Sequence, residues 1–258
     1  HLKAVRILAL CSPGNPTGTV FSKIALQEIC DLVVAENKRR EGKERPLFVL
    51  FDQVYWPTCH GGRKHYTPVE LRPELAPFTV FVDGVSKAFA GTGVRVGWGV
   101  GAPDIIGNMA KFTSHHGSWA PKLLQTATAK FLNRKAEVKS ALIGLQQKLE
   151  TRLGVLSRGL QQLIDEELPI HFIDPQGALY ISFQVKVVGM STAAGEVLDD
   201  NEKIRKYLLK EAGMGIVGFE CFGVDDALTW FRLSVGGVSD KDIDELIPRL
   251  REALKKLS

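Results

Sequence analysis

The sequence lacks the features that mark metal-binding, disulfide-linked and membrane-spanning proteins. Its four cysteines, Cys11, Cys30, Cys59 and Cys221, are widely separated and form no Cys-x-x-Cys pair, so we expect reduced thiols and no metal site. No apolar run approaches the roughly 18 residues that a spanning helix needs, and no signal peptide is recognisable. These absences predict a cytoplasmic protein that does not bind membranes.

A strong charge of one sign is also missing. The 33 basic and 29 acidic residues leave a net charge of +4, which is too even a balance to indicate a nucleic-acid-binding protein. The densest basic segment, NKRREGKER from Asn37 to Arg45, is compatible with a phosphate-binding patch. We favour a solvated helix end and loop.

The 258 residues carry no internal repeat, no low-complexity tract and no initiator methionine. With 45% apolar and 24% charged residues, the composition is typical of a globular protein, and the length suits one large domain or a large and a smaller one. His1 leads almost directly into an apolar segment. We therefore expect the chain to begin partway through a larger protein.

Apolar segments alternate with helical patterns in the first half of the chain. Apolar strands that alternate with helices indicate a mostly parallel sheet covered on both faces. Ser22 is placed to cap the first helix, and we expect that helix to present Ile24, Ile29, Leu32 and Val33 on one side. The predicted strands cover residues 5–10, 46–55, 79–87 and 95–101, and the predicted helices 22–40, 103–112 and 121–132.

The second half of the chain has a different pattern. A long helical stretch over residues 134–167 contains two glycines, and we expect an interruption near Gly154 or Gly159 and a domain boundary near residue 140. A strand pair follows over 170–185, turning at Pro175-Gln176-Gly177. The remaining predicted elements are a helix over 201–212, a strand over 229–237 and an amphipathic helix over 240–257 with Ile243, Leu246, Ile247, Leu250 and Leu254 at helical spacing.

Polar side chains follow the ends of the predicted strands. In an open parallel sheet, ligands bind at the carboxyl ends of the strands, so we expect these side chains to converge. They are Asn15 after the first strand, Asp52 and Tyr55 after the second, Ser86 and Lys87 after the third, and Arg95 at the start of the fourth.

The chemistry of this set points to one cofactor. A lysine in a partly dry crevice can lose its proton and form a Schiff base with a carbonyl compound. An arginine and a serine hydroxyl suit a phosphate. An aspartate can pair with a protonated ring nitrogen, and a tyrosine and an asparagine can hydrogen-bond a phenolate oxygen. Together these partners describe pyridoxal 5'-phosphate.

Four motifs carry a resemblance to a known family. SPGNPTG (Ser12 to Gly18), DQVY (Asp52 to Tyr55), SKAFAGTGVRVGW (Ser86 to Trp98) and FRLS (Phe231 to Ser234) occur in this order, and the chain resembles the class I/II aminotransferases, which are fold-type I pyridoxal-phosphate enzymes. The details are most similar to the aspartate-aminotransferase-like branch. The resemblance covers essentially the whole chain.

The resemblance implies an α/β fold with a mostly parallel sheet flanked by helices. It implies a partial pyridoxal-phosphate-binding large domain over residues 1–139 and a smaller α+β C-terminal domain over residues 140–258. It also implies a homodimer.

The resemblance further implies roles for the strand-end residues. Lys87 is expected to bind the cofactor as a Schiff base and then to move the proton between substrate and cofactor. Asp52 is expected to keep the ring nitrogen protonated. Tyr55 and Asn15 are expected to hydrogen-bond the ring oxygen.

The remaining implied roles concern anions. Arg95 and Ser86 are expected to hold the phosphate, while Asn15 and Arg232 are expected to bind substrate, with Arg232 clamping the α-carboxylate. Arg232 falls on an apolar strand, where an unpaired arginine is costly, and an anionic ligand would remove that cost. Tyr180 either lines the substrate pocket or packs in the core.

Two departures from the family pattern stand out. Relatives usually carry a hydroxyl residue three positions before the lysine, where this chain has Gly84, so a phosphate contact is missing or is supplied otherwise, for instance by water. The family's long N-terminal segment is not found before His1. We expect a truncated or nicked enzyme, with a possible companion N-terminal fragment, that alone binds cofactor weakly and has little activity.

The favoured function is transfer of an amino group from an amino acid, with aspartate or glutamate preferred, to a 2-oxo acid. Two alternatives remain open. One is a fold-type I lyase or decarboxylase, which shares Lys87, Asp52 and Arg95 with the transaminases. The other is a non-catalytic aminotransferase-like sensor domain.

Overall fold

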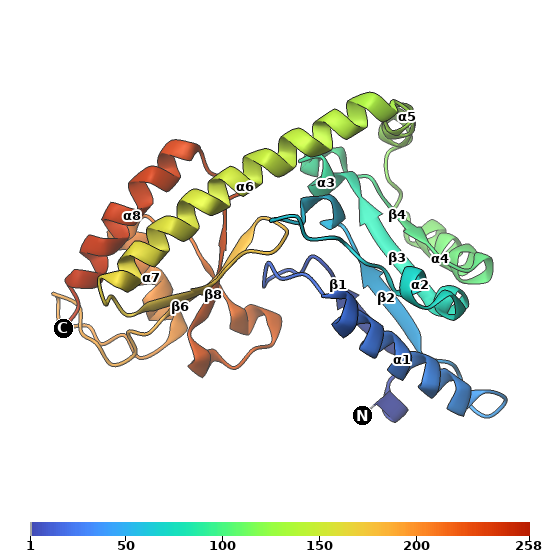
Figure 1. Cartoon of the computed structure of the whole chain (residues 1–258), viewed down its shortest axis with the longest axis horizontal. Helices are drawn as coiled ribbons and strands as arrows, with labels where there is room; N and C mark the ends of the chain where they lie inside the picture. The colour runs from blue at the N-terminus through green and yellow to red at the C-terminus, as the bar shows by residue number, and fades with distance from the viewer. Residues whose placement is uncertain (1) are drawn as a thin grey trace. The chain divides into compact units, whose positions relative to one another are not determined.

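In the computed structural model, which describes residues 2–258, the first four strands form one sheet (Figure 1). The strand order is β1-β2-β3-β4, with the first three strands parallel and the fourth antiparallel to β3. The carboxyl ends of the three parallel strands therefore lie at one edge, as the sequence predicts. The strands are β1 (Ile7–Cys11), β2 (Phe48–Asp52), β3 (Thr79–Gly84) and β4 (Gly97–Val100).

Helices flank both faces of this sheet. Buried residues of α1 pack with Leu47, Val49 and Phe51 on one face. On the other face, Gly99 of β4 lies so close to α4 that an added Cβ would be 3.4 Å from Met109 Cε. The mostly parallel, helix-flanked sheet expected from the sequence is confirmed. The helices are α1 (Lys23–Arg40), α2 (Pro68–Leu71), α3 (Val85–Ala88), α4 (Pro103–His116), α5 (Lys122–Leu132) and α6 (Lys135–Asp165).

The start of α1 is confirmed, and of the four residues expected on one side only Val33 is fully buried. Ser22 Oγ accepts a hydrogen bond from Ala25 N at 3.1 Å and caps the helix. Ile24 and Leu32 are 72% and 60% exposed, whereas Leu26 is fully buried. The buried row continues through Cys30, Val33, Glu36 and Arg40.

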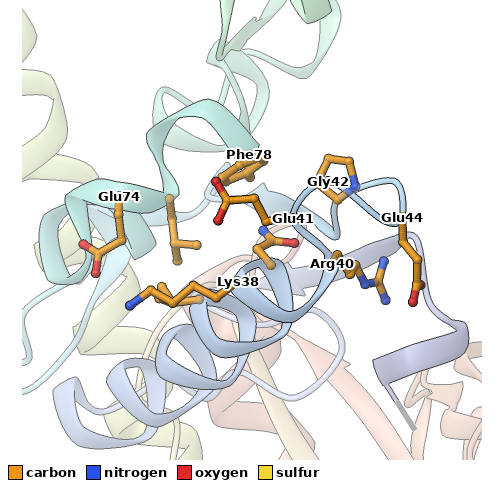
Figure 2. Close-up of a pocket in the computed structure, with 11 residues that line it drawn as sticks. Lys38, Arg40, Glu41, Gly42, Glu44, Glu74 and Phe78 are labelled. Atoms are coloured by element: carbon orange, nitrogen blue, oxygen red, sulfur yellow. The ribbon is translucent and has the colours of Figure 1, made fainter.

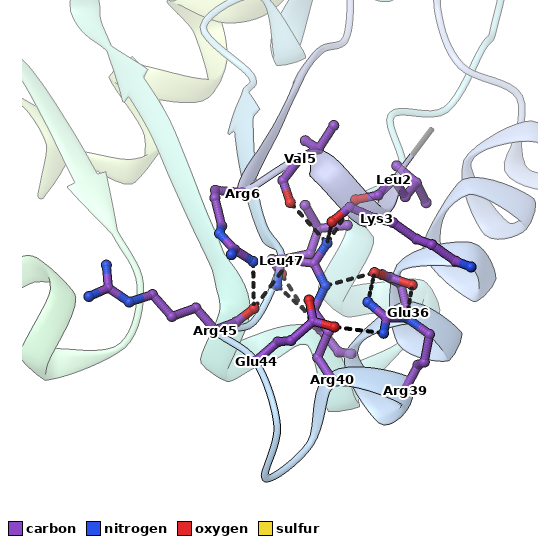
Figure 3. A network of polar contacts seen from close by, with 11 residues as sticks. Leu2, Lys3, Val5, Arg6, Glu36, Arg39, Arg40, Glu44, Arg45 and Leu47 are labelled. Carbon is purple, nitrogen blue, oxygen red and sulfur yellow. Dashed lines mark hydrogen bonds and ion pairs between the residues drawn. The ribbon is translucent and has the colours of Figure 1, made fainter.

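The basic segment at the end of α1 is mostly exposed, as expected, and Arg40 is its buried exception. Arg40 is only 1% exposed, and its guanidinium donates to Glu36 Oε1 at 2.7 Å. It also donates to the carbonyls of Leu2 at 2.7 Å, Val5 at 2.9 Å and Arg45 at 3.2 Å (Figure 3). With a longer bond to Lys3 O at 3.4 Å, the guanidinium has five acceptors from three segments. They offset the cost of burying this arginine, so Arg40 holds the chain before β1 against the end of α1.

The second sheet is antiparallel, with strand order β5-β6-β8-β7. The predicted strand pair over 170–185 is confirmed. Helices α6, α7 and α8 supply most of the buried apolar side chains around this sheet, including the five of α8 that were expected from their spacing. The remaining elements are β5 (Ile170–Ile173), β6 (Tyr180–Val185), β7 (Val217–Gly218), β8 (Trp230–Ser234), α7 (Asn201–Ala212) and α8 (Asp240–Lys255).

Helix α6 is continuous, so the interruption expected near Gly154 or Gly159 is wrong. A Cβ added to Gly159 would lie 2.4 Å from Ile247 Cγ1 of α8. Gly159 therefore permits the two helices to approach closely, and the packing offsets the roughly 1 kcal/mol by which glycine disfavours a helix.

The chain divides into two compact units. Unit 1 comprises the residues up to Gly14 and Thr19–Gln146, and unit 2 comprises Asn15–Gly18 and Gln147–Ser258. The domain limits 1–139 and 140–258 stay predictions. Within residues 2–258, no helix has both the length and the apolarity needed to cross a membrane.

Candidate active site

Asp52 is the last residue of β2 and lies at the predicted edge of the sheet. Its Oδ1 accepts from Val54 N at 3.0 Å, and its carbonyl accepts from Ser12 N at 3.1 Å, just after β1. The half-buried side chain is thus oriented by the backbone that follows it. These bonds join the ends of two strands and the start of the SPGNPTG segment.

Tyr55 is buried directly after this point. Its carbonyl accepts from Thr58 N at 2.9 Å and Thr58 Oγ1 at 2.7 Å, which closes a short 3-10 helix, η2 (Trp56–Thr58). The loop is attached further along, where Gln146 Nε2 donates to Cys59 O at 2.7 Å. Tyr55 therefore occupies a fixed turn that follows Asp52.

Lys87 and Ser86 lie on α3, the single helical turn that follows β3. Val85 N donates to Val96 O at 3.1 Å, and Val85 O accepts from Gly91 N at 3.3 Å. These bonds fold the glycine-rich loop back onto the start of α3. Both side chains are half-buried.

Arg95 returns beside the start of α3 because Val96, the next residue, bonds Val85. Its backbone has φ +57°, which is uncommon for a residue with a side chain, and its Nη1 donates to Thr92 O at 2.9 Å. Among residues 2–258, no hydrogen bond joins Arg95 to Lys87 or Ser86. The fold brings this arginine back to the turn, while its guanidinium bonds its own loop.

Gly84 has a structural reason to lack a side chain. It pairs with Gly97 across β3 and β4, and an added Cβ would lie 3.0 Å from both Gly97 Cα and Val96 O. A hydroxyl residue at this position would press on backbone atoms, which yield less easily than side chains. The close pairing of β3 and β4 therefore explains why this chain has glycine where its relatives usually have a hydroxyl residue.

A buried carboxylate that the sequence analysis missed precedes this turn. Asp83 is 8% exposed, its Oδ1 accepts from Gly84 N at 2.7 Å, and the side chains of Gln53 and Trp56 also hydrogen-bond it. Burial raises the pKa of Asp83, and the nearby charge of Asp52 acts in the same direction. The sequence gives no signal for this residue, because Gln53 and Trp56 follow a different strand from Asp83.

Unit 2 holds the other two predicted binding residues. Arg232 Nη1 donates to Asn15 Oδ1 at 2.7 Å. The guanidinium carbon lies 4.6 Å from the ring centroid of Tyr180 and 5.2 Å from that of Phe222. Arg232 Nε is buried and has no hydrogen-bond partner among the residues that the structure describes. Tyr180 is itself buried and also contacts the guanidinium, so the two interpretations of this residue are compatible.

Backbone contacts hold the segment of Asn15 within unit 2. Gly18 O accepts from Gln176 N at 2.8 Å and Gly177 N at 2.9 Å, and Ser182 Oγ donates to Thr17 O at 2.8 Å. Gly18 has φ +68°, and a Cβ there would lie 2.4 Å from Tyr180 O. Glycine is required here both for its conformation and for the close approach.

A pocket of about 340 Å³ opens elsewhere in unit 1, beside the C-terminal end of α1 (Figure 2). Lys38, Glu41, Glu74 and Phe78 are among the residues that line it. None of the predicted site residues within the described chain contributes to its wall. The strand-end chemistry, and not this hollow, locates the candidate site.

Each unit thus supplies one kind of donor. Unit 1 offers an amine with a carboxylate and a phenol at the edge of a parallel sheet, which suits a ligand with a carbonyl group and a ring. Unit 2 offers a stacked guanidinium with an unused buried donor, which suits a carboxylate. Both kinds of group occur in enzymes that bind a carbonyl cofactor and an amino acid.

Comparison with known proteins gives the family. The family model for aminotransferase class I and II matches residues 1–250, and the chain belongs to this family. It is 28% identical over 255 residues to a probable aspartate/prephenate aminotransferase of Rickettsia bellii, covering 97% of this chain and 58% of that protein. It is also 28% identical to an aspartate aminotransferase of Streptomyces avermitilis over 251 residues, or 97% of this chain and 57% of that one.

Solved structures agree with the fold. The aspartate aminotransferase of Rhizobium meliloti superposes with a TM-score of 0.83 at 26% identity, covering 98% of this chain and 59% of that one. The aromatic aminotransferase of Pyrococcus horikoshii gives 0.81 at 28%, covering 97% and 60%. The chain therefore spans about three fifths of the length of these relatives. Proteins of the aspartate aminotransferase family use pyridoxal 5'-phosphate.

Proposed function

We propose that the chain carries residues of a pyridoxal-phosphate-dependent aminotransferase site that moves an amino group from an amino acid to a 2-oxo acid. The observation that carries this proposal is that Arg232 has a buried hydrogen-bond donor with no acceptor among the described residues. Its guanidinium is held by two rings and by Asn15, yet its Nε is buried and has no partner in the described chain. A substrate carboxylate would supply the missing acceptor and a charge partner in a bidentate geometry.

The donor set of unit 1 fits the cofactor. An amine (Lys87), a carboxylate (Asp52) and a phenol (Tyr55) follow the carboxyl ends of neighbouring strands, and Ser86 and Arg95 lie in the turn around the amine. When bound, pyridoxal phosphate supplies an aldehyde that joins amino groups and a ring that accepts electrons.

Each residue has a separate task in this proposal. Lys87 would hold the cofactor aldehyde through Nζ and, once displaced by the substrate amine, would move a proton at the reacting carbon. Asp52, already oriented by Val54 N, would keep the proton on the ring nitrogen. Tyr55 and Asn15 would donate hydrogen bonds to the ring oxygen.

The two remaining cofactor residues bind the phosphate. Ser86 would donate from its hydroxyl and Arg95 from its guanidinium, which requires Arg95 to exchange its bond to Thr92 O for one to the anion. The positive φ of Arg95 holds that side chain at the end of the returning loop.

The finer features of the function follow the named relatives. We propose an aspartate- or glutamate-like amino donor, because two matched relatives carry aspartate in their names. A homodimer in the cytoplasm completes the proposal, since aminotransferases typically act as dimers.

Borohydride trapping tests the central assignment. The purified 258-residue chain is incubated with pyridoxal phosphate, reduced, digested and mapped by mass spectrometry. We expect the phosphopyridoxyl group on Lys87 in preference to surface lysines, with selective labelling lost in Lys87→Ala and kept in the matched Lys122→Ala. Equal labelling of all lysines would contradict the assignment.

Substrate exchange then separates the enzyme classes. Aspartate labelled with 15N in its amino group and unlabelled 2-oxoglutarate are added to the loaded protein, and 15N-glutamate is the expected product, formed slowly because the chain alone is expected to have little activity. Release of carbon dioxide or an eliminated fragment would favour a decarboxylase or lyase. Cofactor binding with no 15N-glutamate even after prolonged incubation would favour a sensor domain. Arg232→Gln should weaken aspartate binding while leaving trapping on Lys87 unchanged.

A further inference from the structure

We infer that Asp83 is a positioning residue for Lys87, because its carboxylate joins the turn that carries the lysine to the loop of Asp52 and Tyr55. The inference rests on the proposed function, in that it treats Lys87 as the residue that binds the cofactor. Asp83 lies outside the four motifs that carry the family resemblance.

The contacts of Asp83 come from both sides of the candidate site. On the Lys87 side, its Oδ1 accepts from Gly84 N at 2.7 Å, directly before α3. On the Asp52 side, the side chains of Gln53 and Trp56 donate to the same carboxylate. The backbone repeats the connection, because Gln53 N donates to Val82 O at 3.0 Å.

His65 orients the side-chain amide of Gln53, which donates to Asp83. Its Nε2 lies 3.4 Å from Gln53 Oε1, and its ring packs against Phe51 with the centroids 5.9 Å apart. Burial lowers the pKa of His65 to about 4, so the ring is neutral at pH 7. With its proton on Nε2, the ring donates to Gln53 Oε1 and leaves the Gln53 amide nitrogen directed at Asp83.

A carboxylate at this place is costly and is compensated. Asp83 is buried close to Asp52, and both burial and this like charge disfavour its ionised form. The three donors oppose that cost. If the acceptor is lost, the amide of Gly84 and the donors of Gln53 and Trp56 lose their common partner, and a buried donor without a partner is strongly unfavourable.

Loss of the Asp83 acceptor would affect α3, the helical turn that carries Lys87. Lys87 is four residues beyond Asp83, and the start of α3 is held by two backbone donors, Gly84 N to Asp83 and Val85 N to Val96 O. Loss of the first would leave one. The turn would open more often, and the position of Lys87 relative to Asp52 would vary.

The test compares three variants of the full chain with a matched control. Asp83→Leu removes the acceptor, and Gln53→Leu removes one donor. The double variant Asp83→Asn/Gln53→Glu exchanges the amide and the carboxylate, so that a hydrogen bond is kept with donor and acceptor reversed. The control is Thr79→Val, which deletes a buried hydroxyl that donates to Leu75 O at 2.9 Å at the other end of β3.

The first readout is amide hydrogen exchange of residues 84–88 without cofactor. We expect exchange about tenfold faster in Asp83→Leu, a smaller rise in Gln53→Leu, and rates near those of the unmodified chain in the exchanged pair and in Thr79→Val. Unchanged rates in a folded Asp83→Leu would overturn the inference, as would an exchanged pair that behaves like Gln53→Leu. If Asp83→Leu does not fold, Gln53→Leu and the exchanged pair decide.

The second readout is the selectivity of borohydride trapping on Lys87. It should fall with Asp83→Leu and return in the exchanged pair, while a loss of global stability alone would lower it equally in Thr79→Val. If the unmodified chain shows no selectivity, the proposed function fails. The exchange rates then still decide whether Asp83 holds the turn.

Discussion

The buried guanidinium of Arg40 gives the sharpest prediction of stability. Arg40→Leu removes a side chain that is 1% exposed and bonds Glu36 and four backbone carbonyls. The neighbouring Arg39 also bonds Glu36, but its side chain is 38% exposed. Arg39→Leu is therefore a matched control with the same chemistry and a different environment.

The two substitutions should differ by about 2–3 kcal/mol in the free energy of unfolding. Removal of one partner of a buried ion pair costs about 3–5 kcal/mol, and the lower end applies because Glu36 keeps its bond to Arg39. An exposed pair contributes about 0–1 kcal/mol. Arg40→Lys should fall between the two, since it keeps the charge and loses the fork of donors.

Urea unfolding followed by circular dichroism measures the difference. The slope of the transition must stay the same in all variants if the change in midpoint is to report stability, and the transition of unit 1 must be resolved from that of unit 2. Equal destabilisation by Arg39→Leu and Arg40→Leu would refute the reasoning. It would mean that the backbone carbonyls find water as readily as they find Arg40.

Three further predictions follow from single contacts. Burial lowers the pKa of His65 to about 4, so its ring should not titrate by NMR above about pH 5. Because the unfolded chain binds the proton first as pH falls, the free energy of unfolding should decrease between about pH 6.5 and 4. His65→Phe should remove the dependence on pH that comes from this residue. Gly159→Val should destabilise the chain by about 1–3 kcal/mol through overpacking against Ile247, with Ile247→Ala restoring part of the loss in calorimetry. Gly18→Ala should lower the melting temperature more than Gly42→Ala, since both have positive φ but only Gly18 meets backbone atoms.

The sequence predicts the elements of this fold wherever the signal is local. Ser22 and Ser239 each accept a hydrogen bond at a helix start, and caps of this kind act within one turn of the chain. The interruption expected at Gly159 fails because the reason for that glycine lies on Ile247, nearly ninety positions away. Local conformational preference is not decisive when packing supplies the larger energy.

The same distinction applies to the burial of charge. The sequence predicts that Arg40 is solvated like the rest of the basic segment, because the segment itself does not reveal its hydrogen-bond partners. Those partners include the carbonyls of Leu2 and Val5, which lie in the N-terminal segment. The buried row of α1 includes Val33 from the expected apolar side, but Glu36 and Arg40 extend that row in place of apolar residues.

The candidate site shows which functional groups a sequence can indicate. Strand-end positions follow from topology, so the grouping of Asp52, Tyr55 and Lys87 at one sheet edge was predictable, while their roles stay predictions. Asp83 was not predictable, because its meaning depends on donors that another strand end brings to it. A buried carboxylate can be recognised only after its neighbours are known.

The four residues Asn15–Gly18 carry a consequence for how this protein can be divided. They are assigned to unit 2, although the chain on both sides of them belongs to unit 1. A gene fragment that starts within α6 would encode residues 147–258 without this tetrapeptide. Gln176 and Gly177 would then lose the carbonyl of Gly18, and Ser182 would lose the carbonyl of Thr17. Arg232 would lose the side-chain amide oxygen of Asn15. The two units are thus not interchangeable modules along the gene, and recombination that preserves both must carry this tetrapeptide with the C-terminal unit.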